Sequence, residues 1–397
     1  MEKAILRPHR EESILRFHPW VFSGAIAQMT GSPKEGDLVG VYAADGRYLA
    51  CGHYQIGSIA VRILSFDEDP LQEDFWEKMI RRAFRVRVDG GLHGSAVTSC
   101  YRLVHGEGDG LPGLIIDYYD GVCVLQAHSV GMFRSKGAIC AALQAVYGDA
   151  LKAVYDKSSG TAPFKAGLDL VDGYLYKASG FDSDECVVLE NGNRFHVNWN
   201  EGQKTGFFLD QRENRAAVGR LSKGRNVLNL FCYTGGFSIY ALAGGAVHVD
   251  SVDSSRKAMD MVDRNVALNG FKPEQHTSFC ADAIEFLHDV PEGKYDLMIV
   301  DPPAFAKHRG ALKNALRAYQ RLNAAAIAKV SPGGFVFTFS CSQVVDKEAF
   351  ALAVFSAAAE TGRSVRILDR LNQPADHAVN IYHPEGEYLK GLLLYVE

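Results

Sequence analysis

The chain has 397 residues, of which 47% are hydrophobic and 22% charged, with a net charge of −5. This composition excludes intrinsic disorder, no apolar run approaches the roughly 18–20 residues of a membrane span, and the length favours two or three domains. The N-terminus lacks the apolar segment of a secretory signal. The eight cysteines form no CxxC pair or metal-ligand cluster. We therefore expect a cytoplasmic protein with reduced thiols and no metal site.

The first 70 residues predict a small, mostly β module. Short alternating runs cut by glycine and aspartate predict strands at 37–42, 47–52 and 59–64. Ala44-Asp45-Gly46 is typical of a hairpin turn between the first two strands.

A second region, residues 71–188, mixes helices with strands. A charged helix is expected from 72 to about 88, and one alanine-rich helix near 131–147. Strands are expected at 114–117 and 122–125. A hairpin at 187–197, turning on Asn191-Gly192, leads into the third region, residues 189–397.

From about residue 225, apolar strands alternate with helices. The predicted strands are 227–231, 246–252, 276–280, 295–300, 335–340, 365–368 and 389–396. The predicted helices are 237–243, 254–268, 283–289, 311–330 and 346–361. This alternation predicts a parallel, doubly wound α/β sheet, in which ligands bind beyond the carboxyl ends of the strands.

Suggestive residues follow four of these strands. A turn with paired glycines, including Tyr233, Thr234 and Gly235, follows the first strand, and Asp253 ends the second. Asp282 follows the third strand, and Asp301 follows the fourth and opens an Asp-Pro-Pro sequence. A carboxylate at 253 could accept both hydroxyls of a ribose, and one at 282 could accept from an adenine amino group. Each aspartate could instead cap a helix. The GxGxxG fingerprint of nicotinamide enzymes is absent.

The order of these features resembles that of class I S-adenosylmethionine (SAM) methyltransferases. Residues 200–215, 229–237 and 301–305 further resemble the large-subunit (23S) ribosomal RNA cytosine-5 methyltransferases of the RlmI type. The resemblance spans the chain and implies an N-terminal PUA RNA-binding domain, a central α/β domain, a seven-stranded Rossmann-like catalytic domain and a homodimer. It implies cofactor contacts, with SAM or the product S-adenosylhomocysteine, at Thr205, Asp210, Gln211, Arg212 and Asp301. Lys and Arg side chains in this segment could equally be solvated.

Cys341 follows the fifth strand and is expected beside Asp301. A thiolate that adds to carbon 6 of cytosine makes carbon 5 nucleophilic enough to accept a methyl group, and Asp301 could protonate nitrogen 3 during the attack. The alternative is that Cys341 is a small buried hydrophobe, as we expect for the other cysteines. Cys232 is expected to be the only other cysteine near the cofactor. The second cysteine of many RNA cytosine-5 methyltransferases is missing, so the base that removes the carbon-5 proton is not assigned.

A basic stripe follows the Asp-Pro-Pro sequence. No Asp or Glu occurs from 302 to 345, and Arg309, Lys313, Arg317 and Arg321 recur every four residues. On a helix this spacing forms one face, which could contact RNA phosphates or simply be solvated. A second basic cluster on the helix after residue 72 comprises Lys78, Arg81, Arg82, Arg85 and Arg87.

Together these features predict a SAM-dependent enzyme that forms 5-methylcytosine in 23S rRNA. One alternative is the same fold acting on another acceptor, such as a guanine nitrogen, with Cys341 incidental. Another is a non-catalytic RNA-binding protein in which the PUA domain is the working part.

Overall fold

The computed structural model describes residues 1–67, 72–163, 167–306 and 308–397, so the expected boundary at 70–71 lies outside the described residues. The chain forms two compact units. Unit 1 comprises residues 1–188, 197–209 and 375–386, and unit 2 comprises 189–196, 210–374 and 387–397. The division into three contiguous domains stays a prediction. In the described part of the chain, no helix combines the length and apolar character that crossing a membrane requires.

A six-stranded sheet occupies the N-terminal part of unit 1. Its strands are β1 (Glu2–Leu6), β2 (Trp20–Phe22), β3 (Ile26–Met29), β4 (Leu38–Tyr42), β5 (Tyr48–Tyr54) and β6 (Ile59–Ser65), in the order β2-β6-β5-β4-β1-β3, with a short helix α1 (Glu12–Leu15). The three predicted strands are confirmed as β4, β5 and β6. Their inward-facing residues, among them Val41, Ala50 and Ile63, form an apolar core of their own.

A five-stranded sheet forms the second core of unit 1. Its strands are β7 (Cys100–His105), β8 (Leu114–Tyr119), β9 (Val122–Ala127), β10 (Ala153–Asp156) and β11 (Gly173–Lys177), in the order β11-β10-β9-β8-β7. Three helices accompany it: α2 (Phe75–Asp89), α3 (Val130–Arg134) and α4 (Lys136–Tyr147). The expectation of one helix near 131–147 is wrong. The helix is interrupted at Ser135, between α3 and α4. The Ser135 hydroxyl donates a hydrogen bond to the Gly131 carbonyl (2.8 Å) where α3 ends.

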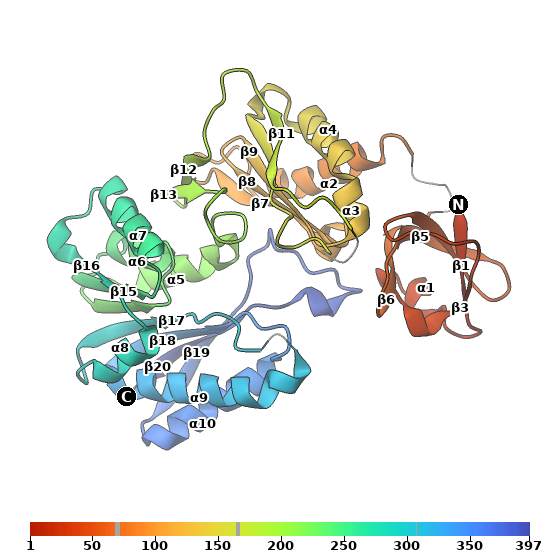
Figure 1. The fold of residues 1–397 in the computed structure, drawn as a ribbon. Coiled ribbons are helices and arrows are strands. Elements are labelled where there is room, and N and C mark those ends of the chain that lie inside the picture. Colours follow the sequence, from red (N-terminus) through yellow and green to blue (C-terminus); the bar gives the residue numbers. More distant parts are fainter. Residues whose placement is uncertain (68–71, 164–166, 307) are drawn as a thin grey trace. The chain divides into compact units, whose positions relative to one another are not determined.

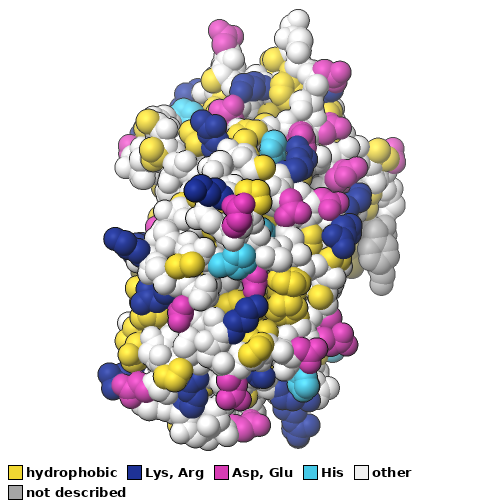
Figure 2. All heavy atoms as spheres, turned by 90° about the vertical axis from the view of Figure 1, so that its left-hand side faces the viewer, with side chains coloured by type: hydrophobic (Ala, Val, Ile, Leu, Met, Phe, Trp, Pro, Cys, Tyr) yellow, Lys and Arg dark blue, Asp and Glu magenta, His cyan; other side chains and the backbone are white. Residues whose placement is uncertain are grey.

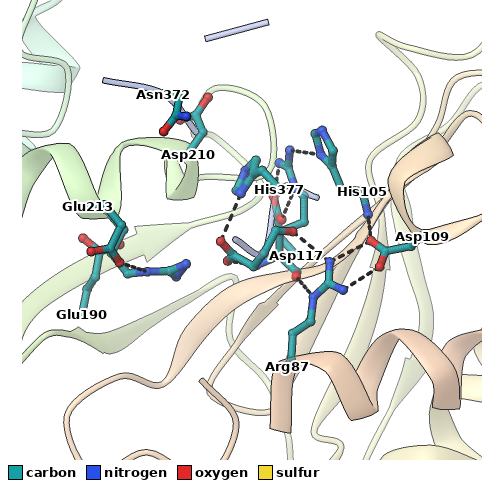
Figure 3. A network of polar contacts seen from close by, with 12 residues as sticks. Arg87, His105, Asp109, Asp117, Glu190, Asp210, Glu213, Asn372 and His377 are labelled. Carbon is teal, nitrogen blue, oxygen red and sulfur yellow. Dashed lines mark hydrogen bonds and ion pairs between the residues drawn. The ribbon is translucent and has the colours of Figure 1, made fainter. Parts of the chain in front are cut away.

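The basic cluster on α2 is not a continuous binding surface. Arg87 is buried and forms two hydrogen bonds, of 2.6 and 2.7 Å, with the carboxylate of Asp109 (Figure 3). Its guanidinium also donates to the carbonyl oxygens of Arg102 and Asp376. Lys78 and Arg81 form ion pairs with acidic residues one turn earlier in the helix. Arg87 is therefore separate from the other basic residues of this helix, because its partners, which include Asp376, bury it.

The predicted hairpin is confirmed as β12 (Glu185–Glu190) and β13 (Asn193–Asn198). Its turn residues have left-handed φ values, 50° at Asn191 and 83° at Gly192. Asn-Gly suits such a turn because both residues tolerate this conformation and the twist matches that of the strands.

A seven-stranded sheet organises unit 2. Its strands are β14 (Asn226–Leu230), β15 (His248–Asp253), β16 (His276–Cys280), β17 (Tyr295–Val300), β18 (Val330–Ser340), β19 (Val365–Leu371) and β20 (Lys390–Val396). The order is β16-β15-β14-β17-β18-β20-β19. The first five strands run parallel, and β20 pairs antiparallel with both of its neighbours. The predicted doubly wound sheet is confirmed.

Six helices flank this sheet: α5 (Arg212–Leu221), α6 (Gly236–Ala243), α7 (Arg256–Leu268), α8 (Ala283–Asp289), α9 (Leu312–Lys329) and α10 (Lys347–Thr361). In Figure 1, α5, α6 and α7 lie on one side of the sheet, and α8, α9 and α10 lie on the other. Through Leu287, Leu322 and Phe350, the helices α8, α9 and α10 pack against the strands in one hydrophobic core. On the face in Figure 2, Lys and Arg are interspersed with Asp and Glu, so this face carries no field of one sign.

Candidate active site

The carboxyl ends of the parallel strands in unit 2 meet at one edge of the sheet. Leu230 of β14 pairs with Val252 of β15 and with Val300 of β17, which in turn pairs with Thr338 of β18. The residues that follow these positions therefore emerge together. They are the glycine-rich turn, Asp253, Asp301 and Cys341.

The glycine-rich turn has an unusual backbone. Phe231, Tyr233 and Gly235 have φ values of 56°, 47° and 80°. The left-handed region is costly for bulky residues, and such strain persists where the surroundings hold it in place. Here the Tyr233 N–H donates to the Asp253 carboxylate (3.0 Å). A Cβ on Gly235 would lie 3.0 Å from a methyl carbon of Val262, so space as well as φ requires glycine there.

The two strand-end aspartates differ in what they do. The Asp253 carboxylate accepts hydrogen bonds from the backbone N–H groups of Tyr233 and Ser255. The N-cap of α7 is Ser255 and not Asp253. Asp253 thus fixes the glycine-rich turn, and its contact with a ribose stays a prediction. The exposed Asp282 accepts from Ile284 and Glu285 (2.8 and 3.1 Å) as the N-cap of α8. The capping alternative describes Asp282, and its adenine contact stays a prediction.

The segment expected to contact the methionine end of a cofactor is divided between the units. Thr205 belongs to unit 1, and residues from Asp210 onward belong to unit 2. The Thr205 hydroxyl donates to the buried Asp117 carboxylate (2.6 Å) and lies 2.9 Å from the Tyr119 hydroxyl. The side chain of Thr205 is therefore already hydrogen-bonded within unit 1, and its cofactor contact stays a prediction.

Asp210, Gln211 and Asp301 form a polar cluster in unit 2. Gln211 Nε2 donates to Asp301 Oδ2 at 2.9 Å, and the Tyr388 hydroxyl donates to Asp210 Oδ2 at 2.7 Å. Asp210 Oδ1 is buried and accepts no hydrogen bond from the residues that the structure describes. Burial, together with the negative charge of Asp210, raises the pKa of Asp301 to about 7. Two such carboxylates favour a cationic ligand, and SAM carries an ammonium and a sulfonium group.

Two arginines of the same segment are buried. Arg212 and Arg215 are each 2% exposed, whereas Lys204 is exposed. Arg215 forms two 2.8 Å hydrogen bonds with Glu190 on β12. The alternative of solvated charges is therefore wrong for both arginines and correct for Lys204. No local sequence signal could have identified Glu190 as the partner, because it precedes Arg215 by 25 residues.

Cys341 is half-buried and follows the last residue of β18 directly. The neighbouring Ser340 donates a hydrogen bond to the Tyr319 hydroxyl on α9 (2.9 Å). Burial raises the pKa of Tyr319 to about 12, and the charges of Cys341 and Asp301 add to that rise. The register of β17 and β18, in which Val300 pairs with Thr338, brings Asp301 and Cys341 to the same edge of the sheet.

Lys390 is a functional candidate that the sequence reasoning missed. It pairs with Ser340 across β18 and β20, is only 6% exposed, and donates to the Ser342 carbonyl at 2.5 Å. Burial lowers the pKa of Lys390 to about 8, although the charges of Cys341, Asp346 and Glu387 oppose that fall. A buried ammonium therefore lies under the turn that carries Cys341. Only the antiparallel pairing of the last strand brings it there.

Two other cysteines lie near this edge. Cys232 is buried, with its sulfur 3.8 Å from that of Met259, and burial raises its thiol pKa. Cys280 ends β16, pairs with Asp253 and is exposed. The strand register thus brings Cys280 to the same edge, and the expectation that Cys232 is the only other cysteine near the cofactor stays a prediction.

The predicted basic stripe is exposed. Arg309 lies in a short 3-10 turn before α9, and Lys313, Arg317 and Arg321 lie on α9 itself, whose opposite face buries Ala315, Tyr319 and Leu322. None of the four cations forms a salt bridge with a residue in the described ranges. This distinguishes them from Lys78 and Arg81 on α2.

Two family models match the chain. A model described as S-adenosylmethionine-dependent methyltransferase covers residues 169–393, and a model of a PUA-like domain covers residues 4–66. The first covers more than half of the chain and includes every residue of the edge described above.

Similar proteins match over the full length. The chain is 39% identical over 396 residues to ribosomal RNA large subunit methyltransferase I from Pseudoalteromonas translucida, which covers 98% of both chains. It is 38% identical over 390 residues to the protein of that name from Aeromonas hydrophila, covering 97% of both. A solved structure of SMU.776, assigned as a methyltransferase and complexed with SAH, superposes with a TM-score of 0.86 at 23% identity over both whole chains. That likeness shows the shared fold.

The position of Asp253 generates a test of SAM binding. Asp253→Ala is expected to weaken SAM affinity about ten- to a hundredfold, since hydrogen bonds to a charged group contribute about 1.5–3 kcal/mol. Calorimetric titration measures the affinity, and circular dichroism checks the fold. Because Asp253 also holds the glycine-rich turn, a 2′-deoxy analogue of the ligand separates the two roles. If the substitution weakens the analogue as much as SAM, Asp253 does not contact the 2′-hydroxyl.

The raised pKa of Asp301 predicts a pH-dependent stability. Between about pH 4 and 7 the folded protein holds the proton that the unfolded chain has released, so this carboxylate makes stability fall as pH rises through that window. Asp301→Asn should remove the fall and raise the free energy of unfolding above pH 7 by about 1–4 kcal/mol. Thermal melts at several pH values measure it, with the exposed Asp289→Asn as control. An Asp301→Asn difference that stays constant with pH would contradict the assignment.

Proposed function

Because the chain belongs to the ribosomal RNA large subunit methyltransferase I family, we propose that it methylates carbon 5 of a cytosine in 23S rRNA through a covalent adduct with Cys341. The alternative of a non-catalytic RNA-binding protein is not supported, since residues 169–393 match the family model of S-adenosylmethionine-dependent methyltransferases. The observation that carries the proposal is the strand register, which brings Cys341, Asp301 and the buried Lys390 to the carboxyl edge of the sheet.

The residues at this edge suit SAM. The glycine-rich turn and Asp253 would hold its nucleoside part, and the carboxylates of Asp210 and Asp301 would attract its cationic methionine end. When bound, SAM supplies an electrophilic methyl group that the activated cytosine can accept. The orphan oxygen of Asp210 supports this assignment, because a buried carboxylate oxygen without a donor is costly unless a ligand satisfies it.

Cys341 acts as the nucleophile in this proposal. Its thiolate forms a bond to carbon 6, and the ring electrons shift so that carbon 5 becomes nucleophilic. The ammonium of Lys390 favours the thiolate over the thiol, because opposite charges attract strongly in a desolvated site. With a pKa of about 7, Asp301 retains a proton in a sizeable fraction of molecules near neutral pH. It can therefore deliver that proton to nitrogen 3 as the sulfur attacks.

The substrate is taken to be RNA presented in the cytoplasm. A base inside folded RNA must leave its stack to reach Cys341. The unpaired cations along α9 follow the Asp301 loop in the sequence and are suited to phosphates nearby. The homodimer that the resemblance implies is also part of this proposal, and sedimentation of the purified chain measures it.

A trapping experiment tests the nucleophile. With 5-fluorocytosine in the RNA, carbon 5 has no proton to lose after methylation, so the thiolate cannot be eliminated. We expect a protein–RNA complex that survives denaturing gels and forms only when SAM is present. Cys341→Ala should abolish both the complex and turnover, because alanine offers no nucleophile.

Two matched variants serve as controls for this trap. Cys280→Ala removes an exposed cysteine at the end of a neighbouring strand, and Cys232→Ala removes a buried one. Both should still form the adduct. Normal methylation of cytosine by Cys341→Ala would show that the proposed mechanism is wrong. If only Cys280→Ala lost the adduct, Cys280 would be the nucleophile instead of Cys341.

The salt dependence of RNA binding tests the basic stripe. Neutral substitution of each of Arg309, Lys313, Arg317 and Arg321 should lower the slope of log affinity against log salt by about 0.7–0.9, while SAM affinity stays unchanged. Arg81→Gln is the matched control, since Arg81 is exposed but lies 2.6 Å from the carboxylate of Glu77. Unchanged slopes in all four variants would assign the stripe to the solvated surface.

A further inference from the structure

Two histidines and a glutamate converge in unit 1, and none of them belongs to the catalytic sheet of unit 2. His18 precedes β2, His383 lies in the segment 375–386, and Glu385 follows in a 3-10 turn at 384–386. One ligand atom of each lies within 4.8 Å of the others. His18 Nε2 is 4.0 Å from Glu385 Oε1, and His383 Nε2 is 3.8 Å from Glu385 Oε2. These separations are too long for hydrogen bonds.

His383 is the most informative member of the cluster. It is 3% exposed, and neither ring nitrogen has a hydrogen-bond partner among the described residues. The Trp20 ring packs against it with centroids 4.2 Å apart. A buried imidazole without partners is costly, so the site is incomplete as it stands.

His18 is oriented by the backbone. The Trp20 N–H donates to His18 Nδ1 at 3.2 Å, and the same nitrogen lies 3.3 Å from the Trp20 carbonyl oxygen. Binding of a metal ion at Nε2 would use the other tautomer, in which Nδ1–H donates to that carbonyl and Nε2 carries the lone pair that faces Glu385. A backbone carbonyl behind a ring N–H is the usual support of a metal-bound histidine, because it fixes both the tautomer and the ring orientation.

The spacing suits a small cation. Nitrogen and oxygen ligands bound to zinc at about 2.1 Å lie roughly 3.4 Å apart in a tetrahedron, so the ligand atoms, which lie within 4.8 Å of one another, would have to approach by up to about 1.4 Å to complete the site. Two imidazoles with one carboxylate favour Zn²⁺ and similar transition-metal ions over Mg²⁺ or Ca²⁺, which prefer oxygen ligands. Glu385 is exposed, and His18 also lines a surface depression with Glu12, Ser13, Arg16 and Tyr382. An ion could therefore exchange with solvent and keep one position open.

We propose that His18, His383 and Glu385 form a binding site for a divalent transition-metal ion of the Zn²⁺ type. Sequence composition led us to expect no metal site, because the ligands stand 365 residues apart in sequence and only folding joins His18 to His383. The ion would link the segment before β2 to the segment 375–386 within unit 1. This site is independent of Cys341 and of methyl transfer.

The test uses the full chain after treatment with a chelator. Titration with Zn²⁺ in a calorimeter should show one tight site, and Co²⁺ should give the visible absorption of a low-symmetry site with nitrogen and oxygen ligands. His383→Gln should weaken Zn²⁺ binding at least tenfold. Glu385→Gln, a change at an exposed position, should weaken it without disturbing the fold. Zn²⁺ should raise the melting temperature of the wild type more than that of Glu385→Gln.

Two further variants locate the ion. His288→Gln alters an exposed histidine 3.1 Å from the Asp289 carboxylate and should bind Zn²⁺ like the wild type. Cys341→Ser should also bind normally. Tight Zn²⁺ binding that survives both His383→Gln and Glu385→Gln, or that is lost only in Cys341→Ser, would overturn the proposal. Absence of tight binding by the chelator-treated wild type would overturn it as well.

Discussion

The parallel pairing of β17 with β14 and β18 is the constraint on which the proposed chemistry depends. Each strand ends at the same level, so Asp301 and Cys341 reach one edge of the sheet. The antiparallel β20 enters the same sheet from the opposite direction and places Lys390 under the turn at Cys341. A shift of one residue in either register would turn these side chains to the other face of the sheet.

Desolvation gives this edge its reactivity. Burial raises the pKa of Asp301 and lowers that of Lys390, so both groups are held close to the pH at which they exchange protons. Two features at this edge are energetically unfavourable. The buried Oδ1 of Asp210 has no hydrogen-bond donor among the described residues, and Phe231 and Tyr233 have left-handed φ values. Such local costs are typical of sites whose ligand supplies the missing interactions.

Much of this architecture could be predicted from the sequence, for local reasons. The alternation of strands and helices has a clear period, so the catalytic sheet could be predicted. The hairpin could also be predicted, because Asn191-Gly192 is typical of a tight turn. Strand-end residues such as Asp301 and Cys341 followed from the same pattern. The role of each strand-end side chain was harder to predict from the sequence. Asp282 is an example, because a carboxylate before a helix has the same local sequence whether it caps the helix or binds a ligand.

The remaining features depend on contacts between distant parts of the chain. Arg87 and Arg215 look like ordinary surface cations in their helices, yet each is buried against a carboxylate that no helical spacing predicts. The same holds for Lys390, whose neighbours are set by the register of β18 and β20. It also holds for His18 and His383, which meet only because the segment 375–386 packs within unit 1. Residue types can suggest such charges, but only the tertiary fold assigns their partners.

The segment 375–386 has a consequence for how the protein is made. It leaves β19 of unit 2, contributes to unit 1, and returns as β20. The buried Arg87 donates to the Asp376 carbonyl, and the Asp376 carboxylate accepts from the Arg102 backbone (2.9 Å). During translation, residues 1–188 must therefore wait for residues 375–386 before the interior of unit 1 is complete. Biosynthesis therefore cannot finish unit 1 before most of unit 2 has been made, so the two units cannot fold strictly one after the other.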